Sequence, residues 1–183
     1  MALSATIFKA DLDISDMDRH YYAHHALTLA MHPSETEERL MVRLLAFALN
    51  ADEALGFTRG LSAEDEPDLW KKDLTGEIDL WIEVGQPDER RLRKACGRAR
   101  KVLVYAFGGR SADIWWDKTA KDLARLDNLS VIKLPEESSA ALETMAQRTM
   151  RLSCTIQDGD VWLTDGQSNV QIHLTPLKTV SSA

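Results

Sequence analysis

Hydrophobic and polar side chains alternate from Glu77 to Val84, and this pattern predicts a β-strand with two unlike faces. Successive side chains on a strand point to opposite faces, so one face is expected to join the core and the other to carry the polar residues. The first face holds Ile78, Leu80, Ile82 and Val84, and the second holds Glu77, Asp79, Trp81 and Glu83. Carboxylates on such a face need water, a cationic partner or a metal ion.

The first part of the chain has the pattern of two antiparallel strands followed by a helix. Alternation over Ala5–Ile14 and an apolar run at Ala26–Ala30 predict the strands, with a polar turn between them. Ser34 followed three residues later by Glu37 is typical of a capping box at a helix start. We therefore expect a helix from Glu35 to about Asp52. Residues 54–73 mix turn formers with acids and predict short strands or loop.

A basic helix and a buried strand are expected after the acidic strand. Pro87 suits the first position of a helix that reaches about Ala99. The continuous apolar run Val102–Phe107 predicts a strand covered on both faces. Strand, helix and strand in this order predict a parallel crossover.

The C-terminal third continues with helices and then changes to short antiparallel strands. We expect a helix at 112–126, a strand at 129–134, a helix at 135–148 and short strands between 150 and 177. Asp158-Gly159 and Asp165-Gly166 are strong signals for hairpin turns.

The whole-chain composition predicts one globular domain over residues 1–183. The 183 residues are 44% hydrophobic and 28% charged, as in ordinary globular proteins. No segment has the roughly 20 apolar residues of a membrane-spanning helix, and no signal-peptide pattern is seen, so a cytoplasmic location without membrane partners is expected. Cys96 and Cys154 lie far apart and outside any CxxC pattern, which favours reduced thiols.

Basic residues concentrate directly after the acidic strand, although the net charge of the chain is −7. This net charge does not favour nonspecific coating of nucleic acid. The local cluster leaves two interpretations open: a solvated helix face, or contacts to the phosphates of DNA or RNA. The candidate nucleic-acid contacts are Arg90, Arg91, Arg93 and Lys94.

Several longer strings of residues resemble the bacterial YaeQ family. They are Ser34–Arg39, Thr58–Ser62, Asp65–Pro67, Leu80–Glu89, Trp115-Trp116 and Thr155–Gly159. The resemblance covers essentially the whole chain. It implies a variant of the PD-(D/E)XK restriction-endonuclease-like superfamily, in the α/β (α+β) class. The expected fold is a mixed β-sheet core flanked by helices, with added N-terminal strands and C-terminal antiparallel hairpins.

The resemblance also implies a magnesium site. In the superfamily, two acids on neighbouring strands hold Mg²⁺, a lysine two residues after the second acid helps to activate water, and a helix glutamate often completes the site. By position, Glu83 is the second acid, and Gly85 stands where the lysine is expected. Gln86 follows and offers an amide that can bind a water or a phosphate. Glu38 is the helix acid, since Glu37 is expected in the capping box.

The first acid of this site has two candidates. Asp79 is preferred, but on a straight strand its Cα lies roughly 13 Å from that of Glu83, so the two would need a bulge to share one Mg²⁺. Asp68, which follows Pro67, is the reserve. Arginines such as Arg91 offer a purely structural role for these acids. The resulting hypotheses are Mg²⁺-dependent phosphodiester hydrolysis, or a non-catalytic module that binds nucleic acid or an unidentified protein.

Overall fold

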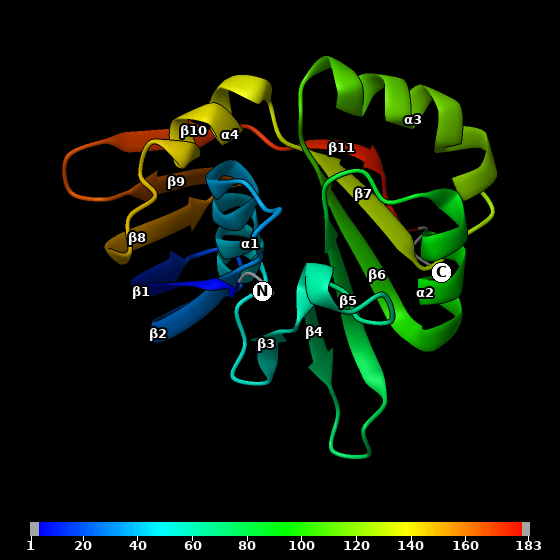
Figure 1. Ribbon diagram of the computed structural model, residues 1–183, viewed down its shortest axis with the longest axis horizontal. Helices are drawn as coiled ribbons and strands as arrows, with labels where there is room; N and C mark the ends of the chain where they lie inside the picture. The colour runs from blue at the N-terminus through cyan, green and yellow to red at the C-terminus, as the bar shows by residue number, and fades with distance from the viewer. Residues whose placement is uncertain (1–3, 181–183) are drawn as a thin grey trace.

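Helix α1 (Glu37–Leu49) lies between two β-sheets in the computed structural model of the protein, which describes residues 4–180 (Figure 1). Side chains all around this helix are buried, from Leu40 to Ala48. They form one hydrophobic cluster with the inner faces of both sheets. The helix is therefore the centre of the main core. Its first turn lies near the end of the second sheet, where Arg39 donates to Val84 O.

The first sheet has five strands in the order β10-β9-β8-β1-β2. Its strands are β1 (Thr6–Asp16), β2 (Tyr21–Met31), β8 (Thr149–Gln157), β9 (Asp160–Thr164) and β10 (Asn169–Ile172). The predicted N-terminal pair and the C-terminal hairpins are both confirmed, since β1–β2, β8–β9 and β9–β10 are antiparallel. Asp158 and Gly159 have φ values of 53° and 81°, as a tight two-residue hairpin turn requires.

The second sheet has six strands in the order β11-β7-β6-β5-β4-β3. Its strands are β3 (Leu55–Phe57), β4 (Leu69–Lys72), β5 (Ile78–Val84), β6 (Ala99–Ala106), β7 (Leu129–Lys133) and β11 (Thr175–Lys178), and a short 3₁₀ helix (Gly60–Ser62) precedes β4. Strands β5 and β6 are parallel, so the predicted crossover through the basic helix is confirmed. Both sheets combine parallel and antiparallel pairs, which confirms the predicted mixed α+β class.

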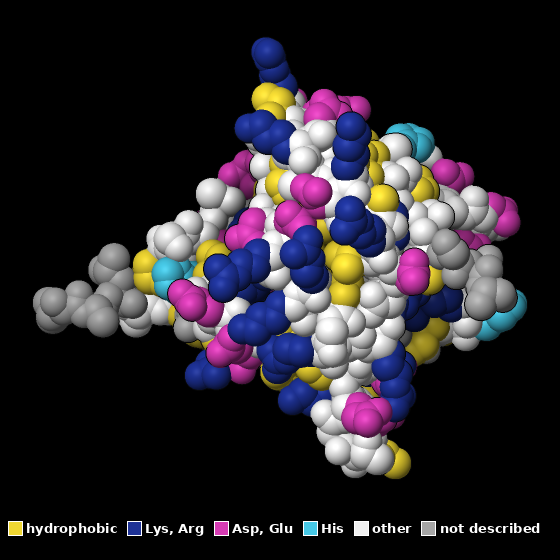
Figure 2. Space-filling model, turned by 90° about the vertical axis from the view of Figure 1, so that its right-hand side faces the viewer, with side chains coloured by type: hydrophobic (Ala, Val, Ile, Leu, Met, Phe, Trp, Pro, Cys, Tyr) yellow, Lys and Arg dark blue, Asp and Glu magenta, His cyan; other side chains and the backbone are white. Residues whose placement is uncertain are grey.

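Helices cover both faces of the second sheet. Helices α2 (Glu89–Arg98) and α3 (Arg110–Leu123) pack on its outer face around a second hydrophobic cluster, and α4 (Glu136–Glu143) packs beside α1 (Figure 1). Lys and Arg side chains gather over the face that carries α2 and α3, although acids are interspersed (Figure 2). No helix within residues 4–180 is long and apolar enough to cross a bilayer.

Two predicted helix starts are each wrong by two residues, because other side chains cap these helices. Thr36, rather than Ser34, caps α1 by accepting from Arg39 N at 3.1 Å. Ser34 instead bonds His32 Nδ1. Asp88 caps α2, so Pro87 precedes the helix and does not open it. The last helix is also shorter than predicted and ends at Glu143.

The two faces of β5 differ from the strict alternation predicted for it. Ile78 joins the outer cluster with Trp81, whereas Ile82 and Val84 join the inner one. The cause is an irregularity in the β4–β5 pairing, where Lys71 pairs with Leu80 but the next residue pairs with Ile78. One extra residue in β5 moves the side chains before it, such as Ile78, to the opposite face of the sheet. Asp79 is this extra residue.

Candidate functional site

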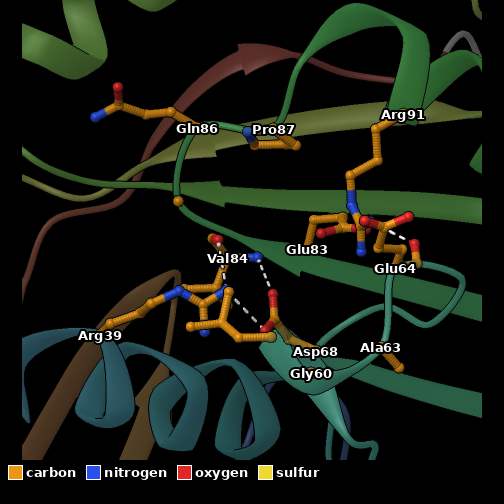
Figure 3. A pocket seen from close by; sticks show the side chains of 12 residues that line it. Arg39, Gly60, Ala63, Glu64, Asp68, Glu83, Val84, Gln86, Pro87 and Arg91 are labelled. Carbon is orange, nitrogen blue, oxygen red and sulfur yellow. Dashed lines mark hydrogen bonds and ion pairs between the residues drawn. The ribbon is translucent and has the colours of Figure 1, made fainter. Parts of the chain in front are cut away.

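An open cleft of about 380 Å³ lies at the end of β5, where the first turns of α1 and α2 approach it (Figure 3). Three acids and two arginines line this cleft, together with the loop that follows β5. Glu64 is exposed, whereas the other two acids, Asp68 and Glu83, are buried. The lining residues that matter for its chemistry are Arg39, Asp68, Glu83, Gly85, Gln86 and Arg91. The arrangement brings together three separate parts of the chain.

Asp68 is held at the junction of β4 and β5. Its backbone N–H donates to Ile82 O at 3.0 Å, which places it beside β5. Its Oδ2 accepts from the Val84 backbone N–H at 2.8 Å, and its Oδ1 accepts from Arg39 Nη2 at 2.8 Å. The side chain is only 3% exposed, so this carboxylate is fixed by its partners rather than by water.

Glu83 lies in the same cleft and is also nearly buried. Its Oε1 accepts from Trp81 Nε1 and from Arg91 Nε, each at 2.8 Å. Its Oε2 has no hydrogen-bond partner among the described residues. Every fully buried side-chain N or O atom of these residues does have a partner, so Oε2 is not fully buried. Oε2 therefore reaches the solvent of the cleft. Burial raises the pKa of Glu83 to about 7, the charge of Asp68 adds to this rise, and Arg91 only partly offsets it.

Each of the two buried acids, Asp68 and Glu83, has its own arginine. Arg91 comes from α2 and also donates to Glu64 O at 2.7 Å and Glu66 O at 2.6 Å, so it ties the loop before β4 to the helix. Arg39 comes from α1 and also donates from Nη2 to Val84 O at 3.3 Å. The pairing of Glu83 with Arg91 is the structural alternative recognised from the sequence. The cleft therefore contains two neighbouring ion pairs.

A buried glutamate supports Arg39 from behind. Glu35 Oε2 accepts from Arg39 Nη1 at 2.7 Å, and both Glu35 oxygens accept from Arg43 at 2.7 and 2.9 Å. Sequence reasoning missed all three residues, because it searched the helix for acids that could bind metal. Part of the signal was present in the i, i+4 spacing of Arg39 and Arg43, which places them on one face of the helix, with the acid Glu35 just before the helix start.

The structure places Asp79 and Glu38 outside the residues that line the cleft. Asp79 Oδ1 accepts from Arg100 Nη1 at 2.5 Å, and Arg100 also pairs with Asp73 and Glu77. Glu38 points toward α4, where its Oε1 accepts from Ser139 Oγ at 3.3 Å. The reserve acid, Asp68, is the one that shares the cleft with Glu83.

Gln86 lines the cleft, but its amide points away from the two acids (Figure 3). Its Nε2 donates to Phe107 O at 3.0 Å and to Ser111 Oγ at 2.8 Å. These bonds connect the loop after β5 to the loop after β6 and to the first turn of α3. The amide therefore acts here as a structural link.

Only Arg91 of the four basic residues proposed for nucleic-acid contact lines the cleft. Arg90 is exposed on α2. Arg93 pairs with Glu89 one turn away, and Lys94 pairs with Asp65 at 3.3 Å. The remaining three thus lie on the outer surface rather than beside Asp68 and Glu83.

The backbone explains why no lysine follows Glu83 at the usual position. Gly85 has φ +105°, a conformation that residues with a Cβ rarely adopt. Space is not the obstacle, since an added Cβ would meet only a Phe107 ring carbon at 3.9 Å. The Gly85 N–H donates to Tyr105 O at 2.9 Å, which holds this turn at the end of the parallel strands.

Gly85→Ala should lower the free energy of unfolding by about 1–2 kcal/mol, because it forces a left-handed backbone on an L-residue. Gly97→Ala is the matched control: Gly97 lies in α2 with nothing within 4 Å of an added Cβ, so alanine should stabilise by about 0.5–1 kcal/mol. Urea unfolding of both variants measures the difference. Equal effects of the two substitutions would contradict this account of Gly85.

The oxygen donors of the cleft fit the chemistry of Mg²⁺. No group of three or more His, Cys, Asp or Glu residues is arranged as a metal site within the described chain. Mg²⁺, however, is often held by only one or two carboxylates and keeps several waters. Arg39 Nη2 already lies between Asp68 Oδ1 and Val84 O, so a cationic group occupies a position between two hard oxygens. Asp68, Glu83 and the Val84 carbonyl form the available donor set.

The fold and the cleft define an α+β protein with two arginine-paired acids at the end of a central parallel strand. A family model described as YaeQ protein matches residues 1–174, so the chain belongs to the YaeQ family. The YaeQ protein of Salmonella typhi is 53% identical over 175 residues, which cover 96% of this chain and 97% of that protein. The resemblance inferred from the sequence is confirmed.

Crystal structures of two YaeQ proteins share the fold. The protein from Xanthomonas axonopodis pv. citri gives a TM-score of 0.93 at 53% identity, over 96% of this chain and 99% of that chain. The protein from Pseudomonas syringae gives a TM-score of 0.92 at 36% identity, over 96% and 97% of the two chains. The two-sheet architecture is therefore that of the family.

Proposed function

We propose that the cleft is a variant of a PD-(D/E)XK nuclease centre, which hydrolyses phosphodiester bonds of nucleic acid with Mg²⁺. The observation that carries this proposal is the meeting of two buried carboxylates, Asp68 and Glu83, from neighbouring strands in one open cleft. Pro67-Asp68 and Glu83 also supply the acidic positions of that motif in the expected order along the chain.

Asp68, Glu83 and the Val84 carbonyl would hold the cation. When bound, Mg²⁺ lowers the pKa of a water ligand and neutralises charge on the phosphodiester. A cation bound there would replace the bond from Arg39 to Asp68, and the Arg39 guanidinium would then be available to a phosphate. Arg39 and Arg91 suit a phosphate because guanidinium groups bind its oxygens in a bidentate manner. No lysine lines the cleft among the described residues, so no amine assists the water.

The charge distribution supports nucleic acid as the substrate. Residues 88–125 hold eleven of the 22 Lys and Arg residues of the chain but only five of its 29 Asp and Glu residues. This segment includes α2 and α3, whose surface carries the basic side chains seen in Figure 2. A phosphate backbone is attracted to such a face even when the protein as a whole is negative.

The test is hydrolysis by the purified protein, with Mg²⁺ or Mn²⁺, of labelled single- and double-stranded DNA and RNA. We expect cleavage that disappears in EDTA and in Glu83→Gln, a substitution that keeps the shape of the side chain. Calorimetric titration with Mg²⁺ in the absence of substrate gives a second readout and should show weaker binding for Glu83→Gln. Cleavage that survives in Glu83→Gln would exclude this cleft as the source of the activity.

A second candidate function is a non-catalytic nucleic-acid-binding module with the same fold. The specific observation in its favour is that Arg39 and Arg91 already neutralise both acids. It predicts neither Mg²⁺ binding nor hydrolysis, while fluorescence anisotropy still detects a labelled oligonucleotide with an affinity that falls linearly on a log–log salt plot. Metal-dependent turnover would exclude it.

A further inference from the structure

Strand β2 forms an unusually long free edge of the first sheet. It has 11 residues and, within residues 4–180, pairs only with β1. The other three sheet edges are β10, β11 and β3, with four, four and three residues. Edge strands present unpaired N–H and C=O groups that can pair with another chain, and short edges are one protection against this. Of the four edge strands in the described part of the chain, β2 alone is long.

The usual devices that block an edge are also absent from β2. The strand contains no Lys, Arg, Asp, Glu or Pro. Its register with β1 continues without a bulge through all positions from Tyr21 to Met31. Along its outer side, the only backbone group with a partner outside the sheet among the described residues is Ala30 O, which accepts from Arg43 Nη2 at 3.1 Å. The rest of this edge is open.

We propose that β2 pairs antiparallel with β2 of a second copy of this chain. A two-fold axis at Ala26, the central residue of the strand, gives the longest overlap and joins two sheets of five strands into one of ten. In this register Tyr22 lies opposite the partner's Ala30, and His24 lies opposite the partner's Thr28. The small side chain of Ala26 lies opposite its own copy at the axis. Because β2 contains no Asp, Glu, Lys or Arg, no like charges meet across the paired strands.

Two exposed hydrophobic side chains support this register. Tyr22 is 62% exposed and Ile7 is 42% exposed. Ile7 is the β1 residue paired with Ala30, so both point to the same side of the sheet. In the proposed dimer the Tyr22 ring passes over the small side chain of the partner's Ala30 and reaches the partner's Ile7 on the next strand. Neighbouring strands in a sheet lie about 4.8 Å apart. The contact forms twice and buries side chains that are otherwise costly to expose.

A second copy is favoured over an unrelated peptide by this self-complementarity. An antiparallel edge is symmetric about its centre, so each outward N–H of one strand meets a C=O of the identical strand. Ala30 O, which already accepts from Arg43, has a second lone pair for the N–H of the partner's Tyr22. Tyr22 lies near one end of β2, and Ile7 lies beside the other end on the neighbouring strand β1, so a two-fold axis brings Tyr22 of each copy to the partner's Ile7. The inference is independent of the proposed function, because β2 lies on the other sheet from the cleft.

Light scattering coupled to gel filtration tests the dimer over a range of protein concentrations. We expect twice the 20.5 kDa chain mass. Ala26→Lys places like charges at the axis and should give a monomer, whereas Gln171→Lys, on the edge strand β10, should remain a dimer. Thermal melting checks that both variants fold. A wild-type monomer at every concentration, or a dimer unaffected by Ala26→Lys, would overturn the proposal.

Thiol cross-linking tests the register without disturbing the edge. A short reagent that joins two thiols should link two chains of Ala26→Cys, since directly opposite Cβ atoms lie about 4.5–5.5 Å apart. Thr28→Cys should not, because the two copies of residue 28 would be offset by four residues, or roughly 13 Å. The wild-type protein controls for its own Cys96 and Cys154. Equal cross-linking of both variants, or none by Ala26→Cys in a dimer, would refute this register.

Discussion

Asp68→Asn should lower the Mg²⁺-dependent hydrolysis proposed above by at least about 100-fold, whereas Asp79→Asn should leave it within about twofold of wild type. Asp68 is 2% exposed, lies in the cleft with Glu83 and offers its oxygens beside the Val84 backbone. Asp79 is engaged by Arg100 outside the residues that line the cleft. Loss of a direct ligand costs more than loss of an outer partner, which typically costs 10–100-fold.

Single-turnover cleavage of one labelled oligonucleotide measures both variants under the same conditions. Calorimetric Mg²⁺ titration and thermal melting separate loss of the cation from loss of the fold, since Asp68 also bonds Arg39 and Val84. A greater loss in Asp79→Asn than in Asp68→Asn would return the site to the acid preferred from the sequence alone.

The choice between these two acids shows where sequence reasoning reaches its limit. Asp79 and Glu83 belong to the same continuous pattern, so the sequence favours them together. Asp68 reaches Glu83 only because β4 pairs antiparallel with β5, with Leu69 opposite Ile82. Strand pairing over this distance is a tertiary fact that periodicity does not contain. The irregularity at Asp79 is equally invisible, since nothing local marks a bulge there.

The elements themselves were largely predictable, because their signals are local. The parallel crossover follows from a strand, a basic helix and the buried run Val102–Phe107, and the hairpins follow from Asp-Gly turns. Helix starts were less predictable, since Ser34, Thr36 and Asp88 are all acceptable caps by residue type. Which of them caps depends on where the preceding chain arrives.

The role of the helix before the cleft was predicted incompletely for a chemical reason. A search for metal ligands favours carboxylates, and Glu38 satisfies it by position alone. The residue of α1 that enters the cleft is instead the cation Arg39, with Glu35 behind it. A buried carboxylate that binds no metal needs a cationic partner. An arginine beside each buried acid could therefore have been expected.

Arg43→Leu should lower the free energy of unfolding by about 3–5 kcal/mol, because it removes one partner of a buried, doubly hydrogen-bonded ion pair. The Arg43 and Glu35 side chains are only 4% and 2% exposed, and Arg43 also satisfies Ala30 O. Lys71→Leu is the matched control. Lys71 and Asp52 are 34% and 40% exposed at 3.1 Å, so losing this pair should cost less than about 1 kcal/mol.

Urea unfolding of the two leucine variants, followed by circular dichroism, measures this difference. Adding Glu35→Gln to Arg43→Leu tests its cause, since the double variant no longer leaves a buried carboxylate short of its partner. We expect it to regain part of the lost stability, although Arg39 then loses a charged partner. Equal losses of stability in Arg43→Leu and Lys71→Leu would show that the ion pairs of Glu35 with Arg39 and Arg43 do not stabilise the N-terminus of α1. Arg39 would then hold its place in the cleft through Asp68 and Val84 alone.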